Sequence, residues 1–311
     1  MEATACQQYE LQFDLPDPYG VAVPTVRSPL NYIGGKYKLL NQILPLFPQR
    51  VRTFFDLFCG GCNVGINVNA DTVVFNDNLT FLIDLYKTFQ CTSTSDIIAH
   101  IEGRIEGLGL SDTNADGYRR LRSLYNEARN PLDLFVLVAY SFNHQIRFNS
   151  AHQFNNPFGT NRSSFNATMK RNLLRFLERL HSGNYLFTAL NFDEFDFSGA
   201  GADDLVYCDP PYLITTGTYN DGKRGFTGWN EREEMKLLNL LSRLDSRGVR
   251  FALSNVLTHK GQANDILLQW VADNDFTVSH LRNNYANSSY HTSNRSADAT
   301  DEVLITNYNP A

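Results

Sequence analysis

Residues 204–212 read DLVYCDPPY, in which an apolar run leads directly into an acid, two prolines and a tyrosine. The β-branched and aromatic residues at 205–208 are typical of a buried strand. Asp209 therefore comes where the strand ends, and the two prolines after it fix the backbone and remove two N–H donors. The sequence predicts a rigid corner that presents an acid at the carboxyl end of a strand.

Further segments have the same apolar character, each short enough for one strand: VRTFFDLF (51–58), TVVFND (72–77), RFALSN (250–255) and EVLITNY (302–308). Between them lie patterns with helical period, at residues 38–46, 79–89, 231–245 and 262–273. Strands that alternate with helices indicate an α/β fold with a doubly wound sheet.

The middle of the chain breaks this alternation. It is helical and polar apart from PLDLFVLVAYSF (131–142), and then runs through SFNHQIRFNSAHQFNNPFGTNRSS (141–164), which has little regular period. Irregular segments of this length are usually functional. The expected organisation is a polar tail (1–22), a catalytic domain in two parts (23–90 and 191–311) and an inserted, mainly helical recognition domain (91–190).

The composition fits a globular protein, with 42% hydrophobic and 19% charged residues. No apolar run is long enough to cross a membrane, and the N-terminus lacks the features of a secretory signal. Five cysteines without a framework spacing favour a reducing compartment. We therefore expect a cytoplasmic protein that does not contact membranes.

Basic residues are concentrated in one part of an acidic chain. The net charge is −6, yet residues 141–180 contain six Lys or Arg and one acid. A local basic face is typical of phosphate contact. The alternative is a solvated helix face around residues 170–179.

A glycine-rich corner, DLFCGGCNVG (56–65), follows the first strand. Its glycines allow a sharp turn and a close approach of the backbone to a ligand. Asp77 ends the next strand, where an acid commonly accepts hydrogen bonds from ribose hydroxyls. The pair predicts a nucleoside site, although Asp77 could instead cap the helix that follows it.

Two other features of the N-terminal part allow alternative interpretations. Cys59 and Cys62 have the C-x-x-C spacing of a redox pair, but a glycine turn explains more of the same stretch, and no second ligand pair supports zinc. In NYIGGKYKLL (31–40), Lys36 is expected to meet a carboxylate or an adenosyl group, unless the stretch is an ordinary turn before a helix.

The corner formed by Asp209, Pro210, Pro211 and Tyr212, called the proline corner below, has a chemistry that suits the amino group of a nucleic-acid base. Such a nitrogen is a poor nucleophile, so acceptors for its hydrogens must be held in place before reaction. Asp209 offers a side-chain acceptor, Pro210 a carbonyl and Tyr212 an aromatic face for stacking. The alternative is a simple strand-ending turn.

These motifs, taken together and in order, resemble the DNA adenine methylase (Dam) family of S-adenosylmethionine-dependent adenine-N6 methyltransferases over about residues 27–311. The similar segments are NYIGGKYKLL, DLFCGGCNVG, VVFNDN, the run from Asn143 to Gly159, DPPY (209–212), FALSN (251–255) and DEVLITNY (301–308). The resemblance implies a Rossmann-like methyltransferase sheet with the recognition domain inserted between the cofactor and catalytic motifs.

The resemblance also implies site residues, a cofactor and partners. The implied cofactor, S-adenosyl-L-methionine, is expected to contact Tyr32, Lys36, Asp56, Phe58, Gly60, Gly61, Asp77 and Asp209. The catalytic residues are expected to be Asp209, Pro210, Pro211 and Tyr212. Double-stranded DNA is expected to contact Asn143, Arg147, Asn149, Asn155, Arg162, Lys170 and Arg171. No metal is implied, and the partner implied besides DNA is a cognate restriction endonuclease that acts separately.

Other functions remain open from the sequence. Cytosine-N4 methylation uses the same amino-group chemistry, and protein-glutamine or ribosomal RNA methyltransferases use related corners. A DNA-binding module without catalysis is an alternative from another class. Residues 213–235 are expected to close over a base flipped out of the DNA or to contact phosphates, and the alternative is a surface loop that leads into the helix from Glu231. Further DNA contacts are expected from Tyr285, Tyr290, His291 and Arg295.

Overall fold

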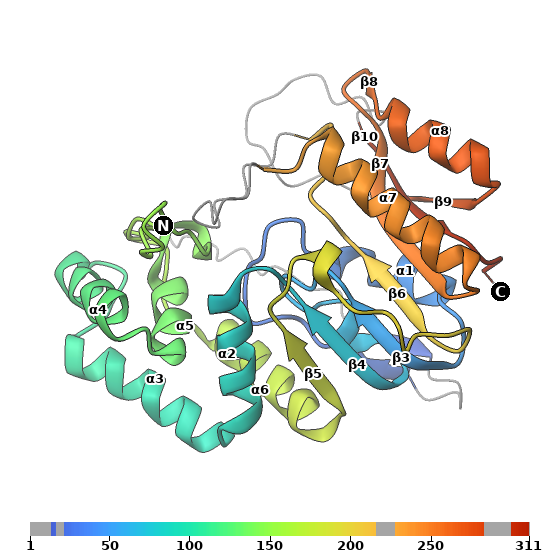
Figure 1. The fold of residues 1–311 in the computed structure, drawn as a ribbon. Coiled ribbons are helices and arrows are strands. Elements are labelled where there is room, and N and C mark those ends of the chain that lie inside the picture. The colour runs from blue at the N-terminus through green and yellow to red at the C-terminus, as the bar shows by residue number, and fades with distance from the viewer. Residues whose placement is uncertain (1–13, 17–21, 216–227, 283–299, 311) are drawn as a thin grey trace, which may run out of the picture.

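The computed structural model describes residues 14–16, 22–215, 228–282 and 300–310 of the chain. Helices cover both faces of a central, mostly parallel sheet (Figure 1). In the described part of the chain this sheet has eight strands: β3 (Val51–Asp56), β4 (Ala70–Asn76), β5 (Tyr185–Thr188), β6 (Leu205–Cys208), β7 (Arg250–His259), β8 (Gln262–Ala263), β9 (Thr277–Leu281) and β10 (Thr300–Thr306).

The strand order is β5-β4-β3-β6-β7-β10-β9, with β8 paired to β7. The first five strands in this order, β5, β4, β3, β6 and β7, are parallel to one another. Strand β10 is antiparallel to both of its neighbours. The chain therefore extends the sheet first from β3 toward β5 and then from β6 toward β7. The strand order reverses between β3 and β6, and ligands of open α/β sheets bind beyond the carboxyl ends of strands at such a point.

Alternation along the strands divides the core between the two faces. In β6, Leu205 and Tyr207 belong to one buried cluster, whereas Val206 and Cys208 belong to the other. Strands that are apolar on both sides must be covered on both sides. This is the doubly wound α/β sheet that the sequence predicts.

The helices are α1 (Leu40–Ile43), α2 (Thr80–Cys91), α3 (Thr94–Leu108), α4 (Ala115–Ala128), α5 (Pro131–Tyr140), α6 (Ala167–Ser182), α7 (Glu231–Ser246) and α8 (Asp265–Asn274), with short 3-10 turns at Lys36–Leu39, Leu44–Leu46, Gly65–Asn67, Phe142–His144 and Phe192–Glu194. Asparagine caps the start of the last five helices with its side-chain oxygen.

Helices α7 and α8 cover one face, and α3, α4 and α5 gather away from them (Figure 1). None of the described helices has the length and apolar character that crossing a membrane requires.

Three elements differ from the sequence-based expectations. Strand β5 lies inside the expected recognition segment 91–190, yet it pairs with β4 and belongs to the central sheet. Strand β9 was not expected, and the predicted helix at 262–273 begins with β8 and becomes helical only at Asp265. The division into catalytic and recognition domains stays a prediction.

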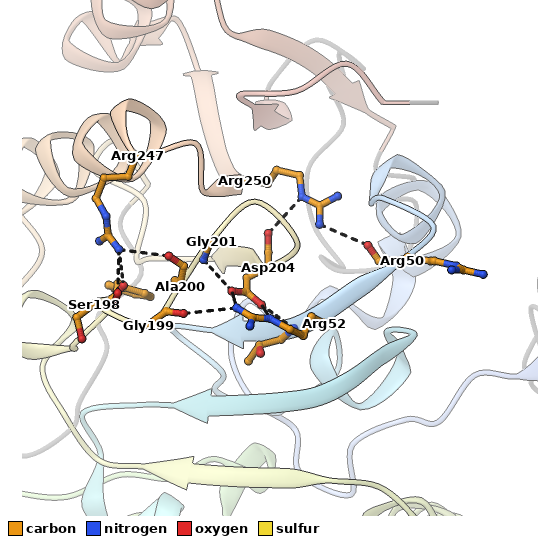
Figure 2. Close-up of polar contacts among 11 residues, drawn as sticks. Arg50, Arg52, Ser198, Gly199, Ala200, Gly201, Asp204, Arg247 and Arg250 are labelled. Carbon is orange, nitrogen blue, oxygen red and sulfur yellow. Dashed lines mark hydrogen bonds and ion pairs between the residues drawn. The ribbon is translucent and has the colours of Figure 1, made fainter.

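The amino ends of the strands, opposite the expected site, are joined by a polar cluster (Figure 2). Asp204 is fully buried and accepts hydrogen bonds from Arg52 Nε at 3.0 Å, from the Thr53 N–H at 3.0 Å and from the Gly201 N–H at 2.8 Å. Burial alone would raise the pKa of Asp204, but the Arg52 guanidinium and the two N–H groups lower it below the usual value. Arg247 donates to backbone carbonyls of the preceding loop, which closes this end of the sheet.

Replacing Asp204 by asparagine is expected to lower the free energy of unfolding by about 1–3 kcal/mol, because N–H donors aimed at a carboxylate lose an acceptor. Because the pKa of Asp204 is lowered, this stabilisation is fully present at neutral pH and is lost as the pH falls below the ordinary aspartate pKa of about 3.9. Urea denaturation measures it, with the exposed neighbour substituted as Asp203→Asn as control. Equal stability of the two variants would contradict this role.

Candidate active site

A pocket of about 930 Å³, part of which is open solvent, lies beyond the carboxyl ends of β3, β4 and β6. It is located where the strand order reverses between β3 and β6. Its lining includes all eight residues that the resemblance assigns to the cofactor: Tyr32, Lys36, Asp56, Phe58, Gly60, Gly61, Asp77 and Asp209. The glycine corner and the acid of the proline corner therefore face one space, although Gly60 and Asp209 are 149 positions apart in the sequence.

The glycine corner is held in a shape that needs its glycines. Gly60 has a φ of +43°, and a Cβ built on it would lie 2.7 Å from the ring of Tyr32. A Cβ on Gly65 would lie 2.4 Å from the ring of Phe75. The loop is also tied to the N-terminal segment, because the Ser28 N–H donates to Asn63 Oδ1 at 2.9 Å. The backbone at Gly60 thus faces the pocket with no room for a side chain.

Asp77 accepts backbone hydrogen bonds on both carboxylate oxygens, although the N-cap of α2 is Leu79 and not Asp77, and contact of Asp77 with a ribose stays a prediction. Its Oδ1 accepts from the Leu79 N–H at 2.9 Å, at the start of α2. Its Oδ2 accepts from the Gly60 N–H at 3.0 Å, which ties it to the glycine corner. The same carboxylate lines the pocket, so it organises the site as well as the helix.

Three aromatic rings form one wall of the pocket. Phe58, Phe192 and Trp229 have ring centroids 5.5–5.8 Å from one another. The indole N–H of Trp229 donates at 2.6 Å to Glu234, a fully buried acid that also accepts from Asn255 and Asn264 at 3.0 Å. Trp229 is therefore oriented by a satisfied buried carboxylate, and the wall suits a flat aromatic group.

Asp209 lies in a cluster of charged and polar groups in which Lys36 and Glu302 are buried and Asp209 and Tyr212 are half-buried. Its Oδ1 is 2.7 Å from Lys36 Nζ and accepts from the Tyr212 hydroxyl at 3.1 Å. The same hydroxyl is 3.1 Å from Glu302 Oε1, and Lys36 Nζ is 3.6 Å from that oxygen. Burial raises the pKa of Asp209, while the Lys36 ammonium and the Tyr212 hydroxyl oppose this rise. The proline corner is thus bound to the N-terminal loop and to strand β10.

The other members of the proline corner are placed differently from Asp209. Pro211 lines the pocket, and Pro210 is buried without lining it. Tyr212 does not line it either: its hydroxyl is turned toward Asp209 and Glu302, and Lys36 Nζ lies 5.0 Å from its ring centroid. Stacking of Tyr212 on a base and acceptance by the Pro210 carbonyl stay predictions.

The residues assigned to DNA lie outside this pocket. Several of them shape the irregular segment at residues 141–164. Asn149 Oδ1 accepts from the Ala151 and Gln153 N–H groups, so its side chain builds a turn. Asn155 is half-buried, and its backbone N–H donates to the Arg147 carbonyl at 3.0 Å. Asn143 is exposed, and its carbonyl accepts from Asn31 at 3.0 Å, which joins this loop to the pocket's N-terminal segment.

The basic residues assigned to DNA differ in exposure and pairing. Arg147, Arg162 and Arg171 are exposed, and the guanidinium of Arg162 lies 4.9 Å from the ring centroid of Phe142. Lys170 forms an exposed ion pair with Glu102 of α3 at 2.7 Å. Two further basic residues, Arg119 and Arg120, are exposed on α4, and Arg119 pairs with Asp116.

The cysteine pair does not have the environment of a reactive thiol. Cys59 and Cys62 are buried, and burial raises the pKa of both thiols. A redox cysteine needs the opposite shift, because the thiolate is the reacting form. The geometry favours the glycine-turn interpretation, with Cys62 itself at a φ of 58°.

Sequence reasoning missed several lining residues and one buried acid. Leu190, Asn191 and Phe192 follow β5, which had been assigned to the inserted segment. The signal was a short apolar run, YLF (185–187), that ends in the polar residue Thr188. Glu302 was recognised only as part of a strand. The other expected contacts, at Tyr285, Tyr290, His291 and Arg295 and over most of 213–235, lie outside the described residues.

Asp56, at the end of β3, is a buried acid whose burial raises its pKa to about 8, against the opposing hydrogen bond from the Gly65 N–H. Between the ordinary aspartate pKa of about 3.9 and this value, the folded state binds a proton that the unfolded state does not. The stability of the protein should therefore fall as the pH rises through this window, by up to about 1.4 kcal/mol per pH unit.

The variant Asp56→Asn should lack this component, so its stability relative to the wild type should rise from about pH 5 to about pH 8. Denaturant unfolding across this range measures the difference. Asp71→Asn, at an exposed acid on the neighbouring strand β4, is the matched control and should keep the wild-type slope. Parallel curves for the wild type and Asp56→Asn would show that Asp56 is ionised in the folded state.

Comparison with known proteins identifies the family that shares this fold and site. The chain is 52% identical over 283 residues to the type II methyltransferase M.FokI of Planomicrobium okeanokoites and, to the same extent, to the modification methylase StsI of Streptococcus sanguinis. Each match covers 91% of this chain and 43% of the relative, so the chain spans less than half the length of these relatives.

A more distant relative is matched over most of its own length. The DNA adenine methylase of Escherichia coli K12 is 27% identical over 236 residues, which are 74% of this chain and 80% of that protein. Residues 32–293 match the family described as D12 class N6 adenine-specific DNA methyltransferase. This match includes the glycine corner, the inserted segment and the proline corner, and the chain belongs to the D12 class N6 adenine-specific DNA methyltransferases.

Proposed function

We propose that this chain transfers a methyl group from S-adenosylmethionine to the N6 amino group of a flipped-out adenine at a specific site in double-stranded DNA. One observation carries the proposal. Asp209 and the glycine corner line the same pocket, so an acceptor for an amino group and a loop shaped for a nucleoside cofactor face one space. Family membership supports adenine as the base and DNA as its carrier.

The groups that line the pocket support S-adenosylmethionine as the cofactor. Gly60 and Gly61 line the pocket without side chains, which allows the cofactor to approach their backbone. Asp77 offers a carboxylate for ribose hydroxyls, and the wall of Phe58, Phe192 and Trp229 offers a surface for the adenine ring. When bound, S-adenosylmethionine supplies an electrophilic methyl group.

The chain's own contribution to the reaction is to hold and polarise the amino group. Asp209 lies at the pocket with its Oδ1 fixed by Lys36 and Tyr212. Its second oxygen can accept a hydrogen bond from N6, which draws electron density onto the nitrogen, and can take up the proton that the methylated nitrogen loses. Pro211 closes the adjoining wall and limits water next to the reacting nitrogen.

DNA recognition is proposed for residues 91–184, which exclude strand β5. Exposed Arg147, Arg162 and Arg171 would meet phosphates or base edges, and Arg119 and Arg120 of α4 would extend the basic surface. The N6 atom is inaccessible in a stacked duplex, so the adenine must leave the helix to reach Asp209. The contact between Asn31 and Asn143 joins the proposed DNA loop to the pocket, which suits delivery of the base.

The biological setting follows from the relatives. Two of them are named as a type II methyltransferase and a modification methylase. We therefore propose that the chain protects host or phage DNA as the methylase of a restriction-modification system, or as a methylase acting alone, in the cytoplasm. A cognate restriction endonuclease would then recognise the same sequence as a separate protein.

The wild-type protein should transfer a labelled methyl group from S-adenosylmethionine to unmethylated plasmid DNA, with N6-methyladenine as the modified nucleoside. Asp209→Ala should lower the transfer rate by about 100-fold or more, because it removes a preorganised acceptor. Asp273→Ala, at an exposed acid on α8, should keep the wild-type rate. N4-methylcytosine as the product would overturn the choice of base, and DNA binding without cofactor binding would favour a non-catalytic module.

Gly60→Ala should weaken S-adenosylmethionine binding by about tenfold or more, since the new Cβ strains a positive-φ position and collides with Tyr32. Calorimetric titration measures the affinity. Gly107→Ala in α3 is the matched control, because a Cβ there meets nothing within 4 Å. Unchanged affinity of Gly60→Ala would place the cofactor away from this loop.

A further inference from the structure

We propose that Glu302 is a positioning residue of the proline corner. Glu302 holds Tyr212 and Lys36 so that Asp209 keeps one oxygen for the amino group of the base. The inference rests on the proposed methyl transfer and adds a residue to its machinery. Glu302 does not line the pocket, so it would act through its neighbours and not on the substrate.

Four side-chain atoms form a closed ring of contacts in which donors and acceptors alternate. Lys36 Nζ lies 2.7 Å from Asp209 Oδ1 and 3.6 Å from Glu302 Oε1. The Tyr212 hydroxyl closes the ring, at 3.1 Å from each of the same two oxygens. Lys36 Nζ and the Tyr212 hydroxyl each lie between the two carboxyl groups, and the single hydrogen of the hydroxyl can be donated to only one of them at a time. Moving one member therefore changes the contacts of the others.

The ring uses only one of the two Asp209 oxygens. Both Lys36 and Tyr212 contact Oδ1, and no described residue donates to Oδ2. Asp209 also lines the pocket, whereas Tyr212 and Glu302 lie behind it. The arrangement therefore fixes the rotation of the Asp209 carboxylate and leaves Oδ2 to accept from N6.

The sheet itself aims Glu302 at this ring. Along β10, Val303 and Ile305 belong to the buried cluster under α7, whereas Leu304 belongs to the opposite cluster together with Tyr207. Since side chains alternate along a strand, Glu302 is on the face of Leu304. The pairing of β10 with β7 shifts between Asp301 and Glu302, an irregularity of the kind that re-aims side chains beside active sites.

Burying the carboxyl group of Glu302 costs free energy of folding, and a role in the reaction would explain why the residue is present. Its side chain is 5% exposed, and burial raises its pKa. Lys36 lies closer to Asp209 than to Glu302, so two acids are placed near the same ammonium group. Removing one member of a buried charged network usually destabilises the fold, whereas Glu302→Gln keeps the volume of the side chain and an oxygen acceptor. A loss of activity without a loss of stability would therefore separate a positioning role from a structural one.

The test compares Glu302→Gln and Glu302→Ala with Asp301→Asn, the matched control on the neighbouring acid, which turns away from the ring to contact His280 at 2.7 Å. We expect Glu302→Ala to lower kcat by about 10- to 100-fold, because the reacting groups lose their alignment. KM for the cofactor should stay near the wild-type value. Glu302→Gln, which keeps an oxygen acceptor for Tyr212, should have a kcat between those of the wild type and Glu302→Ala and a free energy of unfolding near that of the wild type.

A double-mutant cycle tests whether Glu302 acts through Tyr212. Since residues in one network are not additive, adding Glu302→Ala to Tyr212→Phe should lower kcat by no more than about threefold beyond Tyr212→Phe alone. A second readout is independent of turnover: with 2-aminopurine at the target position and S-adenosylhomocysteine present, Glu302→Ala should give a smaller rise in fluorescence on DNA binding than the control.

The outcomes distinguish the two proposals. No methyl transfer by the wild type would overturn the proposed function and this inference with it. Wild-type transfer with Glu302→Ala indistinguishable from Asp301→Asn would overturn the role of Glu302 alone. Losses of kcat that multiply in the double variant would also overturn the role of Glu302. So would a fall in the kcat of Glu302→Gln that is matched by a fall in its free energy of unfolding.

Discussion

The contact of Lys36 with Asp209 is the interaction on which the site depends. A carboxylate at the end of an apolar strand is expensive to bury unless a cation accompanies it. Lys36 supplies that cation from a loop near the N-terminus, with its ammonium 2.7 Å from the acid. The contact brings the first glycine pair, the end of β6 and, through Glu302, strand β10 to one point. Without it, the acid would be drawn into solvent or protonated and would no longer serve as a fixed acceptor.

The sheet makes this contact possible because its order reverses between β3 and β6. The reversal leaves the strand ends without a covering helix, so the loops after β3, β4, β5 and β6 all reach the same pocket. Asn76 joins three of these ends, since its side chain is hydrogen-bonded to the carbonyls of Leu57 and Leu190 and to the Thr188 hydroxyl. A cofactor site and an amino-group acceptor thus become neighbours through topology, although their residues are far apart in the chain.

The sequence predicted the parts of this arrangement that depend on local pattern. Five apolar runs became strands, and the eight expected cofactor residues line one pocket, because strand ends in a parallel sheet share an edge. Strand β5 was missed because YLFT (185–188) is short and follows a helical region. Strand β9 was missed because most of its side chains are partly exposed, so it lacks an apolar run.

Long-range contacts were beyond the reach of sequence patterns. Nothing in EVLITNY shows that Glu302 would meet Tyr212, which lies 90 positions earlier. Asn149 and Asp77 show a second limit, since side chains read as ligand contacts also build turns and helix starts. A single sequence gives residue types at strand ends, but the pairing of those ends comes from the folded sheet.

The most direct measurement is a crystal structure of the protein with DNA that contains its target adenine and with a cofactor analogue that cannot transfer its methyl group. The account predicts the adenine outside the helix, N6 at about 2.6–3.2 Å from Asp209 Oδ2, and the methyl position at about 3–3.5 Å from N6. An adenine that reaches a different face of the sheet, or a cofactor away from the glycine corner, would contradict it.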